Sequence, residues 1–361
     1  MDLVRDWLRR SFADPQVVLL FVLLVGGFAA VIFAGKMLAP AIAAVVIAYL
    51  LDSPATWLRR RGLPNLTAVT IVFLGFLAAA LFALLTILPL LTKQLAQLVQ
   101  QMPSMMARFQ EILLALPERY PALIDEAQVR QIMDSVKLEI LGFGQTALQY
   151  SLNSVMNLVS IVVYAILVPL MVFFFLKDKK SILGWLGKFL PKDRHLVEGV
   201  WREVDQKTGH YVRGKAYEIV IVGSVTFVSF TIIELQFAML LGVLTGFSVL
   251  IPYIGAALVF IPVVFVAFFQ SGLSSELAIA AAVYLIIQAL DGNLLAPLLF
   301  SEAVNLHPNA IIIAVLIFGG LWGFWGLFFA IPLATLAAAV VKAWPRKPTG
   351  LPAAVEQSEQ N

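Results

Sequence analysis

Residues 237–269 read FAMLLGVLTGFSVLIPYIGAALVFIPVVFVAFF, and no charged residue interrupts them. They hold two apolar runs, Phe237–Ile251 and Ala256–Phe269, which are separated by Pro252-Tyr253-Ile254-Gly255. Each run is shorter than the roughly 20 residues that a helix needs to cross a bilayer. Short apolar halves joined through Pro and Gly are typical of broken helices or re-entrant hairpins, which survive at membrane depth only when buried in protein or lining a cavity. The alternative is one long, kinked span.

A second interrupted pair follows, Asn309–Phe318 and Leu327–Val341. Its two runs are separated by glycines interleaved with tryptophans, a pattern that allows either close helix packing or a flexible tip. If both pairs are hairpins, Ala216–Ile233 runs outward and Leu277–Phe300 returns inward. One helix-plus-hairpin unit is then repeated in inverted orientation, as in many secondary transporters. The expected hairpin tips and hinges are Pro252, Gly255, Gly319, Gly320, Gly323 and Gly326.

The apolar region Ala216–Val341 contains no lysine or arginine but five carboxylates: Glu218, Glu234, Glu276, Asp291 and Glu302. Ionisable groups in hydrocarbon are costly, and they commonly mark ion or substrate routes. Because no basic side chain lies in this region, its carboxylates must be protonated, exposed at the membrane surface or matched by a bound cation. This pattern favours solute or proton transport.

Asp291 is the candidate site carboxylate, because the hairpin interpretation places it near the middle of a span. A binding site for a polar solute, a proton or Na⁺ is predicted around it from Gln288, Asn293, Tyr253 and Pro297. Pro297 and Gly292 loosen the helix and free backbone carbonyls beside the carboxylate. The alternative is that Leu290–Asn293 forms a surface turn and that Tyr253 is a hydrogen-bonded residue of the hairpin tip.

The remaining carboxylates have milder interpretations. Glu218 and Glu234 are expected near opposite membrane faces, where long side chains reach water. Glu276 is expected in a solvated loop. Glu302 and His307 flank a polar connection, where they serve either as a gate or proton relay or as helix-capping groups.

Composition supports an all-α, polytopic membrane protein. The chain has 361 residues, of which 61% are hydrophobic and 13% charged, and its mean hydropathy is +0.91. Zero cysteines exclude disulfides and thiolate metal sites. Enzyme and nucleotide-binding motifs are absent, so no cofactor, metal or catalytic role is predicted and transport should be gradient-driven or passive.

The expected organisation follows the apolar runs and the charges. Basic groups concentrate before residue 11, around Arg59–Arg61, in 177–215 and after Val341, which places both termini in the cytoplasm of a bacterial inner membrane. The predicted regions are 1–91 (N-terminal spans hinged at Gly35-Lys36, then Leu66–Leu91), 92–153 (external amphipathic helices broken at Pro103, Pro117 and Pro121), 154–176 (a fourth span), 177–215 (basic, with an interfacial helix at Ser181–Leu190), 216–341 (the transport unit) and 342–361 (a disordered tail).

Several motifs occur together in a fixed order. They are Phe173-Phe174-Phe175-Leu176-Lys177-Asp178, Tyr211-Val212-Arg213-Gly214, Pro252-Tyr253-Ile254-Gly255, Asp291-x-Asn293-x-x-x-Pro297, Asn305-Leu306-His307-Pro308, and Gly319-Gly320 through Gly326 to Pro332. In this the chain resembles the autoinducer-2 exporter family, a group of PerM-like inner-membrane permeases. It departs from that family at Lys215, where Gln is common, and at Gly292, where a larger residue is common.

The resemblance implies solute export, with autoinducer-2 the substrate of some members and Na⁺/H⁺ exchange the activity of others. It also implies about eight transmembrane segments, including the re-entrant hairpins, and a homo-oligomer, a pentamer, in membrane lipid. The net charge of +3 reflects positive loops, so no nucleic-acid partner is predicted. The function predicted first is export of a small polar solute coupled to a proton or Na⁺ gradient. A Na⁺(K⁺)/H⁺ antiporter is the second prediction. A passive oligomeric channel and a non-transporting membrane scaffold are the alternatives from other classes.

Overall fold

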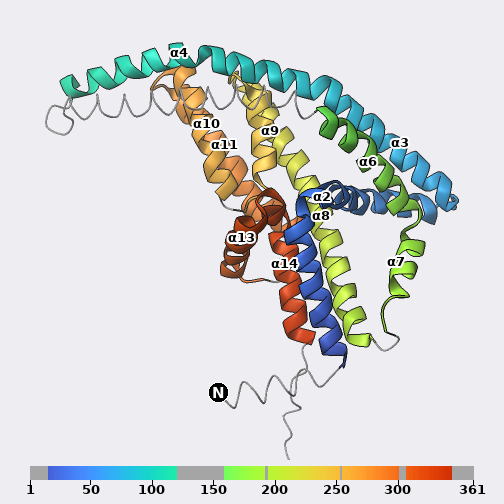
Figure 1. The fold of residues 1–361 in the computed structure, drawn as a ribbon. Helices are drawn as coiled ribbons and strands as arrows, with labels where there is room; N and C mark the ends of the chain where they lie inside the picture. Colours follow the sequence, from blue (N-terminus) through green and yellow to red (C-terminus); the bar gives the residue numbers. More distant parts are fainter. Residues whose placement is uncertain (1–14, 120–157, 192–193, 253, 301–305, 344–361) are drawn as a thin grey trace, which may run out of the picture. The chain divides into compact units, whose positions relative to one another are not determined.

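The computed structural model describes residues 15–119, 158–191, 194–252, 254–300 and 306–343. Every regular element within these ranges is helical (Figure 1). In chain order the helices are α2 (Pro15–Arg60), α3 (Asn65–Phe82), the π-helix η1 (Ala83–Ile87), α4 (Leu88–Arg119), α6 (Leu158–Lys177), α7 (Lys179–Gly187), α8 (His195–Ile232), α9 (Ala238–Ser248), α10 (Ile254–Ser271), α11 (Ser275–Leu290), the π-helix η2 (Asp291–Leu295), α12 (Ala296–Phe300), α13 (Pro308–Trp322) and α14 (Phe324–Ala343).

Seven helical segments of the described residues are long and apolar enough to cross a membrane. They are Pro15–Gly35, Met37–Arg60, Asn65–Met105, His195–Ile232, Ile254–Ser271, Ser275–Phe300 and Phe324–Ala343. Shorter apolar helices occur at Val162–Lys177, Ala238–Ser248 and Pro308–Trp322. The predicted all-α, polytopic membrane fold is therefore confirmed. Helices suit such a chain because they satisfy their backbone hydrogen bonds internally.

The chain divides into two compact units. The first comprises Met1–Lys36, Leu183–Gly209 and Ala303–Asn361, and the second comprises Met37–Ile182 and His210–Glu302. The first unit has a small core in which Leu20, Val200 and Ala339 are buried together. In the same unit Phe28 stacks on Trp322, with ring centroids 5.5 Å apart.

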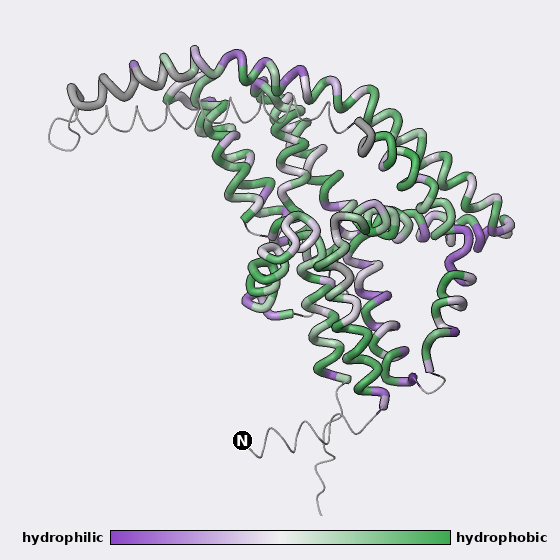
Figure 2. Tube along the Cα trace, in the orientation of Figure 1, coloured by the Kyte–Doolittle hydropathy of each residue, from purple (hydrophilic) through white to green (hydrophobic). Residues whose placement is uncertain are grey.

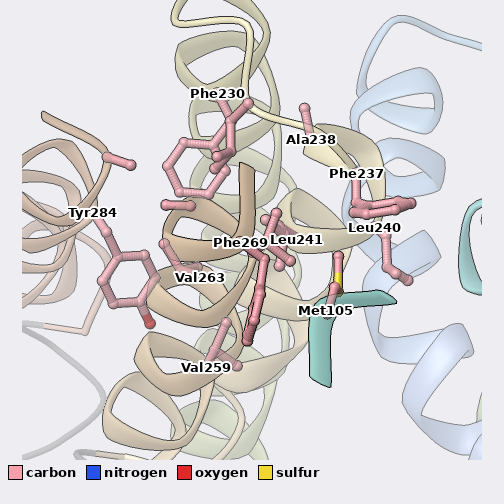
Figure 3. Packing of buried hydrophobic residues seen from close by; sticks show 14 residues of the cluster. Met105, Phe230, Phe237, Ala238, Leu240, Leu241, Val259, Val263, Phe269 and Tyr284 are labelled. Atoms are coloured by element: carbon pink, nitrogen blue, oxygen red, sulfur yellow. The ribbon is translucent and has the colours of Figure 1, made fainter. Parts of the chain in front are cut away.

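The larger core belongs to the second unit and lies between α8, α9, α10 and α11. Figure 3 shows Phe230, Leu241, Val263 and Phe269 gathered there, with Met105 of α4 at one side. Figure 2 shows hydrophilic residues interspersed along α4, whereas α3 is mostly hydrophobic. The apolar residues of α4 thus cover this core, and its polar residues remain available for hydrogen bonding.

Polar side chains secure this packing at the start of α9. The Oε1 atom of Gln94 on α4 accepts a hydrogen bond of 2.8 Å from the backbone N–H of Leu240. That N–H lies in the first turn of α9, where no intrahelical acceptor exists. Near the same end, Gln270 accepts from Gln236 N and donates to the carbonyl of Glu234, both at 2.8 Å. The loop between α8 and α9 is thereby fixed to the end of α10.

Glycines bring α8 and α9 into backbone contact. A Cβ atom on Gly246 would lie 2.7 Å from the carbonyl oxygen of Ile219, and one on Gly242 would lie 3.0 Å from that of Gly223. Such approaches leave no room for larger side chains. The close contact places the end of α9 beside the middle of α8, which matters for the site described below.

The two interrupted pairs are helical hairpins. At the first, the tip glycine Gly255 has no space for a Cβ atom because the carbonyl of Ser248 occupies it. At the second, the carbonyl of Phe318 fills the same space at Gly326. Gly323 ends α13 with φ +58° and donates its N–H to Gly319 O at 2.8 Å, a left-handed turn that glycine adopts without strain. A Cβ atom on Gly320 would meet nothing within 4 Å.

The helix lengths within the hairpins are unequal. α9 has 11 residues and α13 has 15, whereas α10 has 18 and α14 has 20. At about 1.5 Å per residue only the second helix of each pair approaches the ~30 Å thickness of the hydrocarbon core. The Pro252 turn precedes α10, where Ile254 donates to its carbonyl at 2.7 Å. Re-entrance of the hairpins stays a prediction.

One detail of the sequence prediction is wrong. α4 continues through Pro103 and Pro117 instead of breaking at them. Pro103 is exposed, so the backbone carbonyl that it leaves unpaired is not forced into a packed core. The two spans predicted on either side of Gly35-Lys36 are present as Pro15–Gly35 and Met37–Arg60, although the backbone of α2 stays helical between them. Pro121 lies outside the described residues.

A short helix, α7 (Lys179–Gly187), overlaps the predicted interfacial helix Ser181–Leu190 and ends before Phe189; its place at the membrane surface stays a prediction. Trp185 and Phe189, its predicted apolar side chains, are both exposed and meet edge to face with ring centroids 4.9 Å apart. Exposed aromatic rings on a short helix with a basic start are typical of the membrane–water interface. The tail after Ala343 lies outside the described residues.

Candidate functional site

The second unit contains a buried cluster of charged side chains. Lys215 and Glu218 lie on α8 and are only 5% and 3% exposed. The Nζ atom of Lys215 is 2.6 Å from Oε2 of Glu218, and it donates a 2.7 Å hydrogen bond to the carbonyl of Val249 at the end of α9. The carboxyl group of Asp291 lies within hydrogen-bonding reach of Glu218. Two buried ionisable groups and the half-buried Asp291 therefore meet in this unit.

Helical spacing explains why these residues meet. Tyr211, Lys215 and Glu218 recur at i, i+4 and i+7, so they share one face of α8. Tyr284, Gln288 and Asp291 have the same spacing along α11 and into η2. Tyr211 and Tyr284 are among the largest fully buried side chains. The site thus lies where two polar helix faces meet inside an apolar unit.

The backbone changes its form at Asp291. The five residues Asp291–Leu295 form a π-helix between α11 and α12. A π segment contains one extra residue per turn and is frequent at functional sites. Pro297, two residues later, has no N–H to donate to the preceding turn. The predicted loosening of the helix at this position is therefore present.

Phe300 closes one side of the cluster. Its ring centre is 5.0 Å from Nζ of Lys215 and 5.8 Å from the ring centre of Tyr211. Gly214 permits this approach, because a Cβ atom there would lie 2.6 Å from the Phe300 ring and 3.2 Å from the carbonyl of Leu299. Gly214 of the Tyr211-Val212-Arg213-Gly214 motif thus leaves room for the ring of Phe300 to cover Lys215.

Several polar atoms of the cluster lack hydrogen-bond partners. Among the described residues, Oε2 of Glu218, Nε2 of Gln288 and Oδ1 of Asp291 are buried and make no hydrogen bond. The Glu218 oxygen nevertheless forms the ion pair with Lys215, so its contact is electrostatic rather than a well-oriented hydrogen bond. Buried polar atoms without partners are unusual in folded proteins. They indicate a site that a proton, an ion or a solute completes.

The cluster has an unbalanced charge. One ammonium group and two carboxylates give a net charge of −1 when all three groups are ionised, and the described parts of α9, α10 and α12 add no charged residue. A buried net charge is costly. One bound proton or one monovalent cation makes the cluster neutral.

The structure brings together only part of the predicted site. Asp291 and Gln288 lie at the cluster. Asn293 is exposed and donates a 2.8 Å hydrogen bond to the carbonyl of Ala289, and Pro297 is also exposed. Tyr253 and Glu302 lie outside the described residues.

The structure also describes the candidate residues His307, Glu234 and Glu276. His307, of the first unit, precedes α13, and its Nδ1 accepts a 3.2 Å hydrogen bond from Asn309 N, so it caps the helix. This is the capping alternative considered for it. Glu234 and Glu276 are exposed, as expected.

Two residues of the cluster were not predicted as site residues. Glu218 was expected near a membrane face, and Lys215 was noted only as a departure from the family pattern. Glu218 does not reach toward water, because it is buried within the second unit. The region without basic residues begins one position after Lys215, so the nearest cation was left outside it. The spacing of a lysine three residues before a glutamate on one helix was the available signal. Among the described residues, no group of three or more His, Cys, Asp or Glu side chains is placed to hold a metal ion.

The fold and the site together define a class of protein. The chain is a polytopic α-helical membrane protein whose largest unit encloses a charged cluster, as expected of proteins that carry polar cargo across membranes. The model of the AI-2E family transporter matches residues 20–346. The chain belongs to that family.

Relatives from several bacteria agree with this assignment. The chain is 47% identical over 345 residues to "Putative permease PerM" of Escherichia coli (strain K12), which covers 96% of this chain and 98% of the relative. It is 27% identical over 304 residues to "Putative transport protein YrrI" of Bacillus subtilis (strain 168), with 84% of each chain covered. The names describe transport rather than catalysis. The resemblance inferred from the motifs is confirmed.

Proposed function

We propose that the chain is a secondary transporter that exports a small polar solute, similar to autoinducer-2, across the bacterial inner membrane. Transport is coupled to a proton or Na⁺ gradient through Lys215, Glu218 and Asp291. The observation that carries this proposal is the buried cluster, whose net charge and unpartnered atoms leave room for one exchangeable ion. Membership of a transporter family supports the class of function but not the solute or the direction.

The surroundings of the cluster favour a solute rich in hydroxyl groups. Nε2 of Gln288 supplies an unused donor, and Oδ1 of Asp291 supplies an unused acceptor. A small solute that both donates and accepts hydrogen bonds satisfies both atoms, whereas an apolar solute satisfies neither. The exposed Asn293 lies two residues beyond Asp291 and supplies further amide atoms near the site. Movement of the hairpin-bearing part against the rest of the chain then exposes the site to either side.

A cation/proton antiporter is the second candidate, because two adjacent carboxyl groups also suit exchange of a proton for a metal cation. Flux measurements in proteoliposomes separate the candidates. Transport of autoinducer-2 that is accelerated by a proton or Na⁺ gradient supports the exporter. Flux that persists without a gradient and does not saturate indicates a passive channel instead. No flux of any tested solute leaves a membrane scaffold as the explanation.

The site itself is tested with matched variants. Asp291→Asn and Glu218→Gln keep the shape and hydrogen-bonding capacity of each side chain but remove its titration. We expect both to lose the response of transport to the gradient. Glu276→Gln is the control, since Glu276 is exposed at the start of α11 and bonds only to Ser274 among the described residues. Equal losses in the control would remove the special role of the cluster.

We further propose that both termini face the cytoplasm and that 92–153 faces outward. The α4 helix covers the core with some of its apolar residues, but Leu95 and Val99 remain 49% and 41% exposed. A second copy of the chain would cover them, which supports homo-oligomers, pentamers by resemblance. Deletion of 107–134, which retains the buried Met105, should give smaller particles in detergent. An unchanged particle size would contradict this arrangement.

A further inference from the structure

We infer that the ammonium group of Lys215 permanently occupies the cation position of the site, so that the exchanged ion is a proton and not an alkali cation. This inference rests on the proposed coupling of transport to an ion at the cluster. It selects one of the two coupling ions that the proposed function leaves open.

The ligands of Lys215 are those that a metal cation would use. The ammonium lies against a carboxylate oxygen of Glu218 at 2.6 Å, the backbone carbonyl of Val249 at 2.7 Å and the face of the Phe300 ring at 5.0 Å. In transporters with broken helices, the C-terminal carbonyls of half-helices commonly coordinate Na⁺. Val249 is the C-cap residue of α9, a half-helix of 11 residues. Lys215 therefore takes the place of such an ion.

The ammonium group of Lys215 has three favourable neighbours. A lysine head group has three N–H bonds and no acceptor. The carbonyl of Val249 accepts one of them, the carboxylate of Glu218 forms an ion pair with the ammonium, and the ring of Phe300 attracts the remaining positive face. The carbonyl of Val249 also lies at the negative end of the α9 dipole, which favours a cation there. The lysine is thus held firmly and is not a mobile surface chain.

Among the described residues, the buried side-chain atoms of the cluster that make no hydrogen bond include two oxygens, Oδ1 of Asp291 and the Glu218 oxygen that already faces Lys215. Nε2 of Gln288 is also buried without a hydrogen bond, but it is a donor and does not bind metal ions. An alkali cation needs several oxygen ligands and would also lie close to the ammonium of Lys215. A proton needs only one carboxyl oxygen. The remaining position thus fits a proton better than a metal ion.

The proton has a defined place. The carboxyl groups of Glu218 and Asp291 lie within hydrogen-bonding reach of each other, and two carboxyl groups hydrogen-bond only when one of them carries a proton. Loading one proton changes the charge of the cluster from −1 to 0, and its release restores −1. The other titratable groups facing the cluster are Tyr211 on α8 and Tyr284 on α11; the described parts of α9, α10 and α12 supply none.

Thermal unfolding of the purified full-length protein in lipid nanodiscs tests this inference without any transport assay. The unfolding midpoint is measured in NaCl and in choline chloride at equal ionic strength. A ligand that binds only the folded state raises the midpoint, and the rise saturates with concentration. We expect no difference between the two salts for the wild type. A saturable, Na⁺-specific rise that Asp291→Asn abolishes would overturn the inference.

Removal of the lysine should create the missing cation site. Lys215→Gln leaves the carboxylate and the carbonyl of Val249 free, so we expect its apparent affinity for Na⁺ to exceed that of the wild type by about tenfold or more. Lys207→Gln is the matched control. Lys207 also lies 2.7 Å from a glutamate oxygen, of Glu203, but the two side chains are 26% and 30% exposed. We expect no Na⁺ response from this control.

The outcomes separate this inference from the proposed function. A folded Lys215→Gln protein without a Na⁺ response would contradict the occupied cation position, whatever the transport assay shows. If that variant does not fold in either salt, the wild-type measurement still decides, since it needs no variant that removes the lysine. Absence of solute flux in proteoliposomes would refute the transport proposal while leaving the Na⁺ measurement valid.

Discussion

The ion pair between Lys215 and Glu218 should stabilise the folded chain cooperatively, and a double-mutant cycle measures this. The two side chains are 6% and 4% exposed. Lys215→Met leaves two buried carboxyl groups without their cation and deprives the carbonyl of Val249 of a hydrogen bond. Breaking one side of a buried pair typically costs about 3–5 kcal/mol, so this loss is expected for Lys215→Met.

The other variants should cost less. Glu218→Gln keeps an oxygen near the ammonium, and Asp291 still neutralises Lys215, so the expected loss is about 1–2 kcal/mol. The double variant removes the pair as a whole and leaves a near-isosteric polar side chain, for which a loss of about 1–2 kcal/mol is also expected. The difference between the double variant and the sum of the single variants is then about 2–6 kcal/mol.

The assay is reversible unfolding in mixed detergent micelles, with the same cycle on Lys207 and Glu203 as the control. That pair is partly exposed and belongs to one helix at i and i+4, so its coupling should be about 0.5 kcal/mol or less. A coupling for Lys215 and Glu218 no larger than that of the control would refute the reasoning. It would mean that the cluster is hydrated rather than buried.

Two further predictions concern packing and topology. Gly246→Ala places a Cβ atom 2.7 Å from the backbone carbonyl of Ile219, so α8 and α9 must separate at a cost of about 1–3 kcal/mol. We expect a lower unfolding midpoint for this variant. Gly26→Ala is the control and should not lower the midpoint, because a Cβ atom there meets nothing within 4 Å. Ser104 lies on an exposed part of α4, and the chain has no cysteine of its own. We expect Ser104→Cys to react with a membrane-impermeant thiol reagent added from outside. Labelling from the cytoplasmic side alone would reverse the proposed orientation.

Much of the fold could be predicted from the sequence because the lipid environment limits the choices. Apolar runs of about 20 residues must be helical, and the Pro and Gly interruptions around Gly255 and Gly326 marked both hairpin tips. The prolines of α4 were less informative. A proline disfavours a helix interior but does not always end the helix. α14 continues through the buried Pro332 just as α4 continues through the exposed Pro103, so the outcome depends on tertiary packing.

The site could be predicted only in part for a similar reason. Asp291 and Gln288 were found because Gly292 and Pro297 loosen the helix around them. Glu218 was not found, since its neighbours along the sequence do not show that α9 approaches α8 closely enough to bury it. That approach depends on contacts such as those of Gly246, which join residues distant in the chain.

The central claim is that a proton on the carboxyl pair couples transport to the gradient, and one comparison tests it most directly. Proteoliposomes containing wild type, Asp291→Asn or Glu276→Gln are loaded with autoinducer-2, and efflux is followed under imposed pH gradients. We predict that efflux from the wild type and from Glu276→Gln responds to the gradient. We predict no response from a folded Asp291→Asn protein. Normal, pH-dependent efflux through Asp291→Asn would contradict the account.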